Sequence, residues 1–125
     1  MRLLLDTHIP LWAMQGSKHL SVQARSLMKQ ADAIYISSAS LWEIAIKAAP
    51  GRFDVDSAEL AAERDSAGFP PLPVEWRHTT TLRTLPPLHK DPFDRMLVAQ
   101  AISEPLRLLT HGRALVPYSD VVTLV

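Results

Sequence analysis

Apolar residues occur along the chain in two patterns that alternate with each other. Short continuous runs typical of buried strands occupy residues 3–5, 33–36, 106–110 and 121–124. Apolar residues recurring every three or four positions predict helices over residues 9–14, 22–31, 41–48, 57–67, 75–85 and 92–104. The proline-broken stretch 69–74 predicts at best a very short strand at a sheet edge.

Strands that alternate with helices predict an α/β fold, in which a central, mostly parallel sheet is covered on both faces. The 125 residues are enough for one domain, spanning 1–125, and we find no internal repeat, linker or low-complexity segment. Binding and catalytic sites of such sheets gather at the C-terminal ends of the strands. Acids that follow a strand are therefore the first candidates for chemistry.

Composition narrows the function classes. Thirteen basic and thirteen acidic residues cancel, so long-range attraction to nucleic acid is weak and any RNA binding needs a local patch. No cysteine is present, which excludes disulfides and cysteine-based zinc sites. The N-terminal apolar run Leu3–Leu5 is too short for a signal peptide or a membrane span, so we expect a cytoplasmic protein without a membrane partner.

Three acids stand at strand-to-helix junctions: Asp6, Glu43 and Asp94. Each has an ordinary structural explanation. Asp6 fits a helix cap, Glu43 fits a capping box with Ser40 or an ion pair with Lys47, and Asp94 compensates a helix dipole. Near Asp94, Asp91 reads as the N-cap of the same helix, with Pro92 in its first position.

Taken together, the three acids predict a metal site. Their junctions would bring them to one edge of the sheet, where carboxylates about 4 Å apart repel by roughly 1–4 kcal/mol per pair. A cation relieves this repulsion, and an all-oxygen donor set favours Mg²⁺ or Mn²⁺. Such ions suit the hydrolysis of phosphodiester bonds, because they activate water and stabilise the leaving oxygen.

Three blocks of the sequence carry a family resemblance. LLLDTH at 3–8, SSASLWEIAIK at 37–47 and HKDPFDRMLVAQA at 89–101 resemble the signature blocks of PIN-domain ribonucleases, and more narrowly of VapC-type toxins. The resemblance implies a three-layer α/β/α sandwich, catalytic and metal-binding roles for Asp6, Glu43 and Asp94, and RNA cleavage with Mg²⁺ or Mn²⁺. It also implies a homodimer and a cognate VapB-type antitoxin.

One block departs from the family pattern. Thr110-His111-Gly112-Arg113 has glycine where the family usually carries a fourth acid, which puts a second metal in doubt. Asp91 is the nearest acid to compensate, and Asp120 a more remote one. An alternative hypothesis is therefore a catalytically weakened PIN domain that binds RNA or an antitoxin without efficient cleavage.

Further residues are candidates for substrate binding. The Thr7 hydroxyl is placed to hold a metal-bound water or a phosphate, or to make a local backbone hydrogen bond. Lys47, Arg95 and Arg113 are candidates for a basic rim that binds RNA phosphates. The apolar neighbours of Trp42 predict core or dimer packing instead of base stacking.

Two other enzyme or signalling classes fit less well. A phosphatase of the haloacid dehalogenase type needs a second aspartate two residues after the first, and position 8 is histidine. A receiver-type signalling module needs an acidic pair near the first strand, and no such pair is present.

Overall fold

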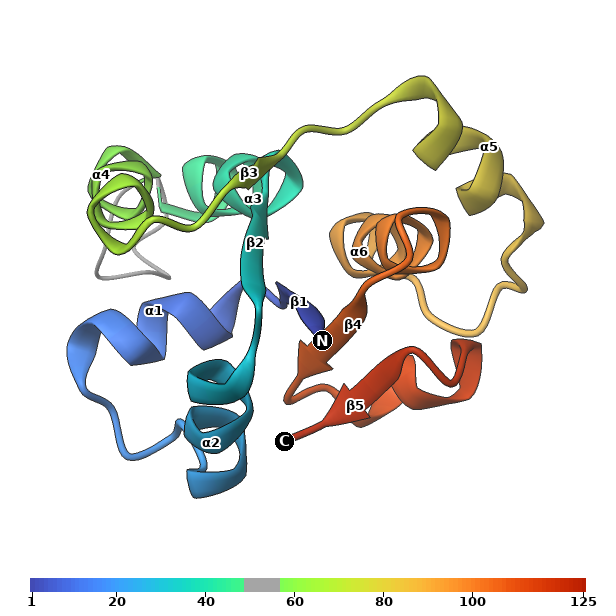
Figure 1. The fold of residues 1–125 in the computed structure, drawn as a ribbon. Helices are drawn as coiled ribbons and strands as arrows, with labels where there is room; N and C mark the ends of the chain where they lie inside the picture. The colour runs from blue at the N-terminus through green and yellow to red at the C-terminus, as the bar shows by residue number, and fades with distance from the viewer. Residues whose placement is uncertain (49–56) are drawn as a thin grey trace.

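The structure is a computed structural model that describes residues 1–48 and 57–125. Its elements follow the chain in the order β1 (Arg2–Leu5), α1 (His8–Gln15), α2 (Val22–Gln30), β2 (Ala33–Ser37), α3 (Ser38–Ala48), α4 (Ser57–Ala67), β3 (Pro71–Leu72), α5 (Trp76–Thr84), α6 (Pro92–Ser103), β4 (Arg107–Thr110), the 3₁₀ helix η1 (Arg113–Tyr118) and β5 (Val122–Leu124) (Figure 1). The predicted order of strands and helices is confirmed. The short helix η1 was not predicted, because its six residues offer no helical repeat.

The five strands form one parallel sheet in the order β3-β2-β1-β4-β5. Strand β1 is central, with Leu4 in register with Tyr35 of β2 and with Leu108 of β4. The two-residue β3 lies at the edge, as the proline-broken stretch predicts. Because the strands are parallel, the residues that follow β1, β2 and β4 meet at one edge of the sheet.

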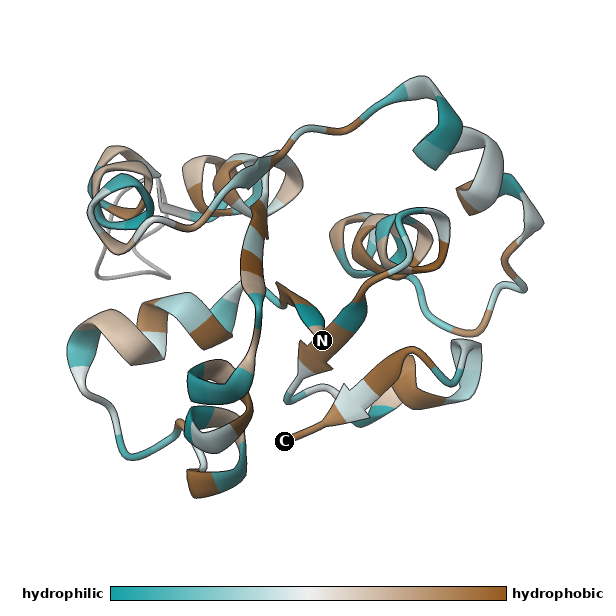
Figure 2. Ribbon diagram, viewed as in Figure 1, coloured by the Kyte–Doolittle hydropathy of each residue, from teal (hydrophilic) through white to brown (hydrophobic). Residues whose placement is uncertain are grey.

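The two faces of the sheet have separate cores. Leu3 and Leu5 pack toward α1 and α2, whereas Leu4 packs toward α6 with Leu97 and Val98. All three leucines of β1 are fully buried, which explains why its sequence is a continuous apolar run without alternation. Figure 2 shows hydrophobic segments along the strands and the helix surfaces that cover them. The predicted three-layer α/β/α architecture is confirmed.

Local signals set most helix ends. Ser21 caps α2 by accepting a hydrogen bond from the Ala24 N–H at 3.0 Å, and Gly16 ends α1 in the left-handed conformation, with φ at 60°. Helix α3 begins at Ser38, earlier than predicted, so Ser40 lies inside the helix. The predicted capping box of Ser40 and Glu43 is therefore wrong. Two sequence signals lie outside the described residues: Pro50-Gly51, expected to end the helix predicted over 41–48, and Asp56, the alternative to Ser57 as the start of the next helix.

Trp42 lies outside the core of the chain, since its residue surface is 62% exposed. Of the two expected settings, core packing is therefore wrong, and dimer packing stays a prediction. The Trp42 ring meets the Phe93 ring edge-to-face, with centroids 5.0 Å apart. Trp42 therefore lies over the groove between α3 and α6 and outside the core.

In the described part of the chain, no helix has the length and apolar character that crossing a membrane requires.

Candidate metal centre

The predicted acids line one cavity at the C-terminal edge of the sheet. It has a volume of about 260 Å³. Its lining residues are Asp6, His8, Glu43, Lys47, Asp91, Asp94, His111 and Gly112. Asp6 follows β1, Glu43 comes from α3, and Asp91 and Asp94 come from the start of α6. The topology thus brings together acids that are up to 88 residues apart in the sequence, from Asp6 to Asp94.

Asp6 is held rigidly by its neighbours. Its Oδ1 accepts the Thr7 N–H at 2.7 Å, and its Oδ2 accepts the Thr110 hydroxyl at 2.6 Å. Burial raises the pKa of Asp6 above its ordinary value, although the hydrogen bonds from Thr110 and Thr7 oppose this, and the charge of Glu43 raises it further. Sequence reasoning missed Thr110. The register of β1 with β4 supplies the signal, since it places the residues after Leu5 and Leu109 side by side.

Glu43 is buried, and both of its carboxylate oxygens have partners. Oε1 accepts a hydrogen bond from the Thr7 hydroxyl at 2.6 Å, and Oε2 accepts one from the Lys47 ammonium, one helical turn away. The hydroxyls of Thr7 and Ser40 are 3.0 Å apart. In this structure Thr7 therefore orients an acid of the cavity through its hydroxyl, a role different from the predicted ones.

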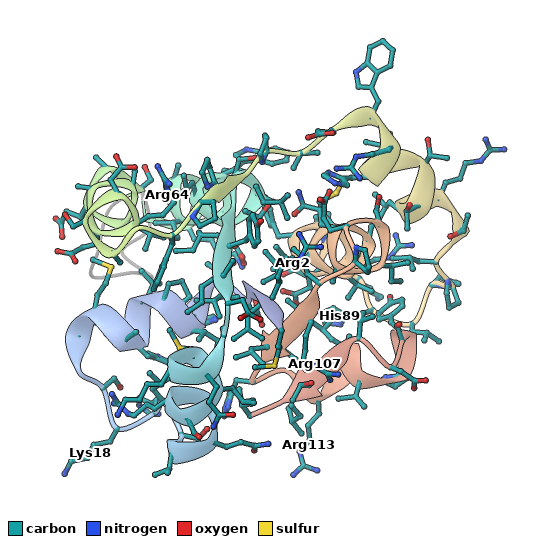
Figure 3. All side chains as sticks on the ribbon, in the orientation of Figure 1. Arg2, Lys18, Arg64, His89, Arg107 and Arg113 are labelled. Carbon is teal, nitrogen blue, oxygen red and sulfur yellow. The ribbon has the colours of Figure 1, made fainter. Side chains whose placement is uncertain are left out.

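Asp94 is partly buried among other negative charges of the cavity. Burial raises its pKa from 3.8 to about 6, with further contributions from the negative charges of Asp6 and Asp91. The imidazole Nε2 of His89 lies 2.9 Å from Asp94 Oδ2 and partly opposes the shift. His89, which Figure 3 labels, is therefore the direct neighbour of a candidate ligand.

Asp91 uses its two oxygens differently. Oδ1 accepts the backbone N–H groups of Phe93 at 2.8 Å and Asp94 at 3.1 Å, so the predicted N-cap is confirmed. Oδ2 lies 3.7 Å from Lys47 Nζ. Burial alone would lower the pKa of Lys47, but its hydrogen bond to Glu43 and the charges of Glu43 and Asp91 raise it. Lys47 is thus a firmly protonated cation within the acidic cavity.

Gly112 forms the part of the wall where the family pattern carries an acid. Its N–H donates to Thr110 Oγ1 at 2.9 Å, and its φ of −87° is open to any residue. A Cβ at this position would meet Thr110 Oγ1 at 3.4 Å, an ordinary contact. The absence of the acid is therefore not imposed by lack of space. His8 and His111 complete the rim, and both pack against Trp12, with ring centroids 5.5 and 5.1 Å apart.

Three sequence candidates lie away from the cavity. Asp120 lines a different cavity with Arg2 and Arg107 at the N-terminal ends of the strands, so it does not compensate for Gly112. Arg95 donates to the Leu85 carbonyl at 3.3 Å and is absent from the described lining. Arg113 is exposed and projects from the start of η1 (Figure 3). The structure therefore does not bring Arg95 or Arg113 to the acids.

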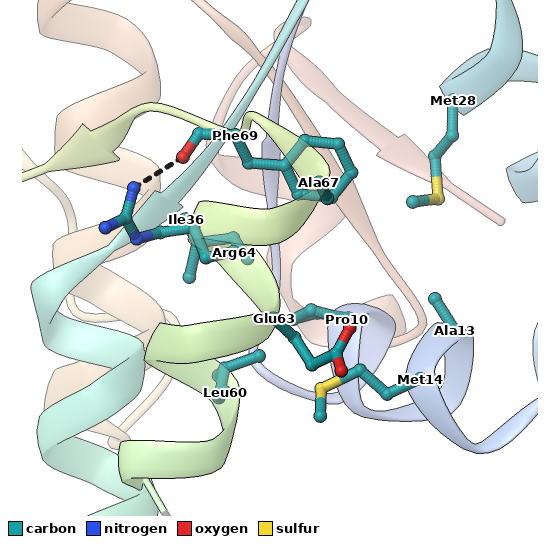
Figure 4. A pocket seen from close by; sticks show the side chains of 10 residues that line it. All are labelled: Pro10, Ala13, Met14, Met28, Ile36, Leu60, Glu63, Arg64, Ala67 and Phe69. Atoms are coloured by element: carbon teal, nitrogen blue, oxygen red, sulfur yellow. Dashed lines mark hydrogen bonds between the residues drawn. The ribbon is translucent and has the colours of Figure 1, made fainter.

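A second cavity, of about 190 Å³, lies between α1, α2 and α4 (Figure 4). Its lining is mainly apolar, with Met14, Met28 and Phe69 among the contributors. Glu63 is the single acid among the described residues that line it, and Arg64 is held by the Phe69 carbonyl at 2.6 Å. This cavity lacks converging polar groups, so the acidic cavity remains the candidate site.

The donors of the acidic cavity fit a divalent cation in chemistry. They are carboxylate oxygens whose mutual repulsion shows in the raised pKa of Asp94. In this structure the carboxylates are not arranged to coordinate an ion. Among residues 1–48 and 57–125, no three acidic or imidazole side chains lie close enough together to hold a metal ion. Glu43 accounts for part of this, since it is turned to Thr7 and Lys47.

Comparison with known proteins identifies the class. The family model of the PIN domain matches residues 3–119, so the chain belongs to the PIN domain family, as the three sequence blocks predict. No curated protein sequence gives a significant match.

Solved structures share the fold at low sequence identity. VapBC2 from Rickettsia felis, bound to a DNA fragment from its promoter, has a TM-score of 0.70 and 18% identity, covering 100% of this chain and 98% of that chain. A toxin–antitoxin complex from Klebsiella pneumoniae has a TM-score of 0.68 and 17% identity, covering 97% and 95%. DNA-bound VapBC from Salmonella typhimurium has a TM-score of 0.65 and 16% identity, covering 100% and 97%.

Proposed function

We propose that this PIN-domain chain is a VapC-type toxin, an endoribonuclease that hydrolyses RNA phosphodiester bonds with Mg²⁺ or Mn²⁺. The observation that carries the proposal is the convergence of Asp6, Glu43 and Asp94 on one cavity at the C-terminal edge of the sheet. Membership of the PIN family supports nuclease chemistry with a divalent metal. Likeness to toxin–antitoxin complexes supports the toxin assignment.

In this mechanism, Asp6, Glu43 and Asp94 would hold the divalent ion, and Asp91 contributes negative charge from Oδ2, the oxygen that does not cap the helix. A divalent ion held by these acids would supply Lewis acidity toward the phosphate and the attacking water. Thr110 and Thr7 fix the orientation of Asp6 and Glu43 through their hydroxyls. The rim imidazoles of His8 and His111 and the Lys47 ammonium provide donors for the phosphate oxygens of RNA.

We also propose the partners that the toxin assignment implies. These are an RNA substrate, a cognate VapB-type antitoxin and a second copy of the chain, in the cytoplasm. The exposed apolar side chains of Trp42 and Ile46 on α3 support a protein partner, since contiguous exposed apolar surface marks interaction sites. Residues 1–125 are proposed to act as one PIN domain.

The competing hypothesis is a catalytically weakened PIN domain that binds RNA or an antitoxin. Gly112 favours it, because one carboxylate fewer lowers the affinity for a second ion. The two hypotheses differ in whether metal-dependent cleavage occurs at all.

The first prediction concerns Asp94→Asn. This change removes a carboxylate ligand while keeping the shape of the side chain, so we expect cleavage of a single-stranded RNA in Mg²⁺ or Mn²⁺ to fall by about 100-fold or more. Asp120→Asn is the matched control, because Asp120 lies at the opposite end of the strands. Excess EDTA should abolish cleavage by the unaltered chain. Equal, chelator-resistant cleavage by all three proteins would rule the nuclease proposal out.

The second prediction concerns Gly112→Asp. The φ of Gly112 and the 3.4 Å clearance at its Cβ position allow the new side chain, which would face the acidic cavity. We expect tighter Mn²⁺ binding by isothermal titration, by about tenfold, and faster cleavage. Gly112→Ala is the matched control, because it removes the glycine without adding a carboxylate. Unchanged affinity and rate in Gly112→Asp would show that the missing acid does not limit this site.

A further inference from the structure

Lys47 lines the acidic cavity and makes contacts with Glu43, Asp91 and Phe93 that the proposed mechanism does not explain. Its ammonium donates to Glu43 Oε2, lies 3.7 Å from Asp91 Oδ2, and lies 5.9 Å from the centroid of the Phe93 ring. Its side chain is only 26% exposed. The Lys47 ammonium thus forms one ion pair with Glu43 of α3 and one with Asp91 at the start of α6. Cation–π attraction to the Phe93 ring adds to these two ion pairs.

The contacts of Glu43 link the position of the Lys47 ammonium to metal binding. Oε1 is engaged by Thr7 and Oε2 by Lys47, and Glu43 is almost fully buried. A divalent ion that binds Glu43 through Oε2 would therefore compete with the ammonium for that oxygen. The two cations also repel each other, by an energy that is substantial at the low effective dielectric of a partly buried site. Binding of the ion and the ammonium contact are therefore thermodynamically coupled, and each weakens the other.

We propose that Lys47 is a positioning residue that holds Glu43 in the metal-free cavity and competes with the divalent ion for it, so that Lys47 sets the metal affinity of the site. This inference rests on the proposed metal-dependent function. In the absence of metal, Lys47 neutralises part of the charge of three carboxylates, those of Glu43, Asp91 and Asp94. When metal binds, Glu43 turns from the ammonium to the ion. Lys47 thereby raises the metal concentration at which the site becomes loaded.

The test measures Mn²⁺ affinity by isothermal titration on metal-free protein at pH 8, without RNA. Lys47→Met removes the charge, and we expect about fivefold or greater tightening of Mn²⁺ binding, the lower end of ordinary coupling between sites. Lys47→Gln, which keeps a donor for Glu43, should change in the same direction. Lys47→Arg keeps the charge and should stay within about twofold of the unaltered chain. Lys18→Met is the control for an exposed lysine away from the cavity.

A second readout is the melting temperature. Removing the ammonium leaves a buried carboxylate unpaired, so metal-free Lys47→Met should melt below the unaltered chain. Saturating Mn²⁺ should then raise its melting temperature by more than it raises that of the unaltered chain. A lysine with a purely structural role would lower both melting temperatures equally. If Lys47→Met does not fold, Lys47→Gln carries the same comparison.

The outcomes separate the two proposals. Equal or weaker Mn²⁺ binding by Lys47→Met and Lys47→Gln, with clear binding by the unaltered chain, overturns the competition and leaves the nuclease proposal intact. No Mn²⁺ binding by any of the proteins overturns the metal-dependent function, and the competition with it. Tighter binding by both neutral variants, with Lys47→Arg unchanged, supports the competition.

Discussion

Asp94 carries part of the electrostatic cost of the site, together with Asp6, whose pKa is also raised. The Asp94 carboxylate is partly buried near two other negative charges, and its pKa is raised to about 6 for these reasons. A folded protein keeps such a group only where another interaction compensates for the cost or where function requires it. The structure provides a partial compensation in His89, at 2.9 Å. The remaining repulsion is what a divalent ion would relieve.

The raised pKa of Asp94 predicts a pH dependence of stability. Between about pH 4 and pH 6, folded Asp94 holds a proton that the unfolded chain has released, so this group makes the metal-free protein more stable as the pH falls. Asp94→Asn mimics the protonated form. We expect its free energy of unfolding to exceed that of the unaltered chain by about 1 kcal/mol at pH 7, a value discounted for partial exposure.

Urea denaturation in EDTA at pH 4, 5, 6 and 7 measures this difference. It should shrink as the pH falls through 6 and be smallest near pH 4. A difference that is constant with pH would show that Asp94 does not titrate in this range.

At the scale of elements, the start of α6 combines two functions in one turn. Asp91 caps the helix with Oδ1 and faces Lys47 with Oδ2, while Asp94 points into the cavity from the first turn. The positive end of the helix dipole favours both acids. The cap therefore also fixes the position of the candidate ligand, because both depend on the same backbone turn.

Two substitutions at Asp91 separate these functions. Asp91→Ala removes the cap and should lower the free energy of unfolding by about 1 kcal/mol, whereas Asp91→Asn keeps an acceptor and should cost only a few tenths of a kcal/mol. If Asp91 serves as a cap alone, Mn²⁺ affinity in Asp91→Asn will match that of the unaltered chain. An affinity lowered by about tenfold or more would instead make Asp91 a ligand. Thermal denaturation and isothermal titration give the two quantities.

At the scale of the whole molecule, the order of the strands places the site. β1 lies at the centre of the sheet between β2 and β4, so Asp6 stands between the helix that follows β2 and the strand that carries Thr110. The helix that precedes β4 brings Asp91 and Asp94 to the same edge. The chain has no net charge, and four of its thirteen acidic residues line this cavity. Any attraction of RNA must come from cations at the same rim.

Local patterns were sufficient for the elements and for the identity of the main acids. Hydrophobic periodicity predicted the strands and helices because burial on a sheet or a helix face imposes period and length on the sequence. The N-caps Ser21 and Asp91 were predictable because capping depends on a few neighbouring backbone groups. Asp6 and Glu43 were predictable because parallel strands bring their C-terminal ends together. The predicted strand-to-helix junction at Asp94 is wrong, because α6 follows α5, with no strand among the described residues between them.

Only the tertiary structure decided what each polar side chain contacts. Thr110, the last residue of β4, donates a hydrogen bond to Asp6 across 104 residues, whereas Asp120, shortly before β5, lies at the opposite end of the sheet. Trp42 is exposed despite its apolar neighbours. These outcomes depend on register and on contacts between distant segments, which local periodicity does not encode. The pairing of Glu43 with Lys47 was visible as a four-residue spacing, but its burial beside Asp91 and Asp94 arose only when α3 and α6 packed together.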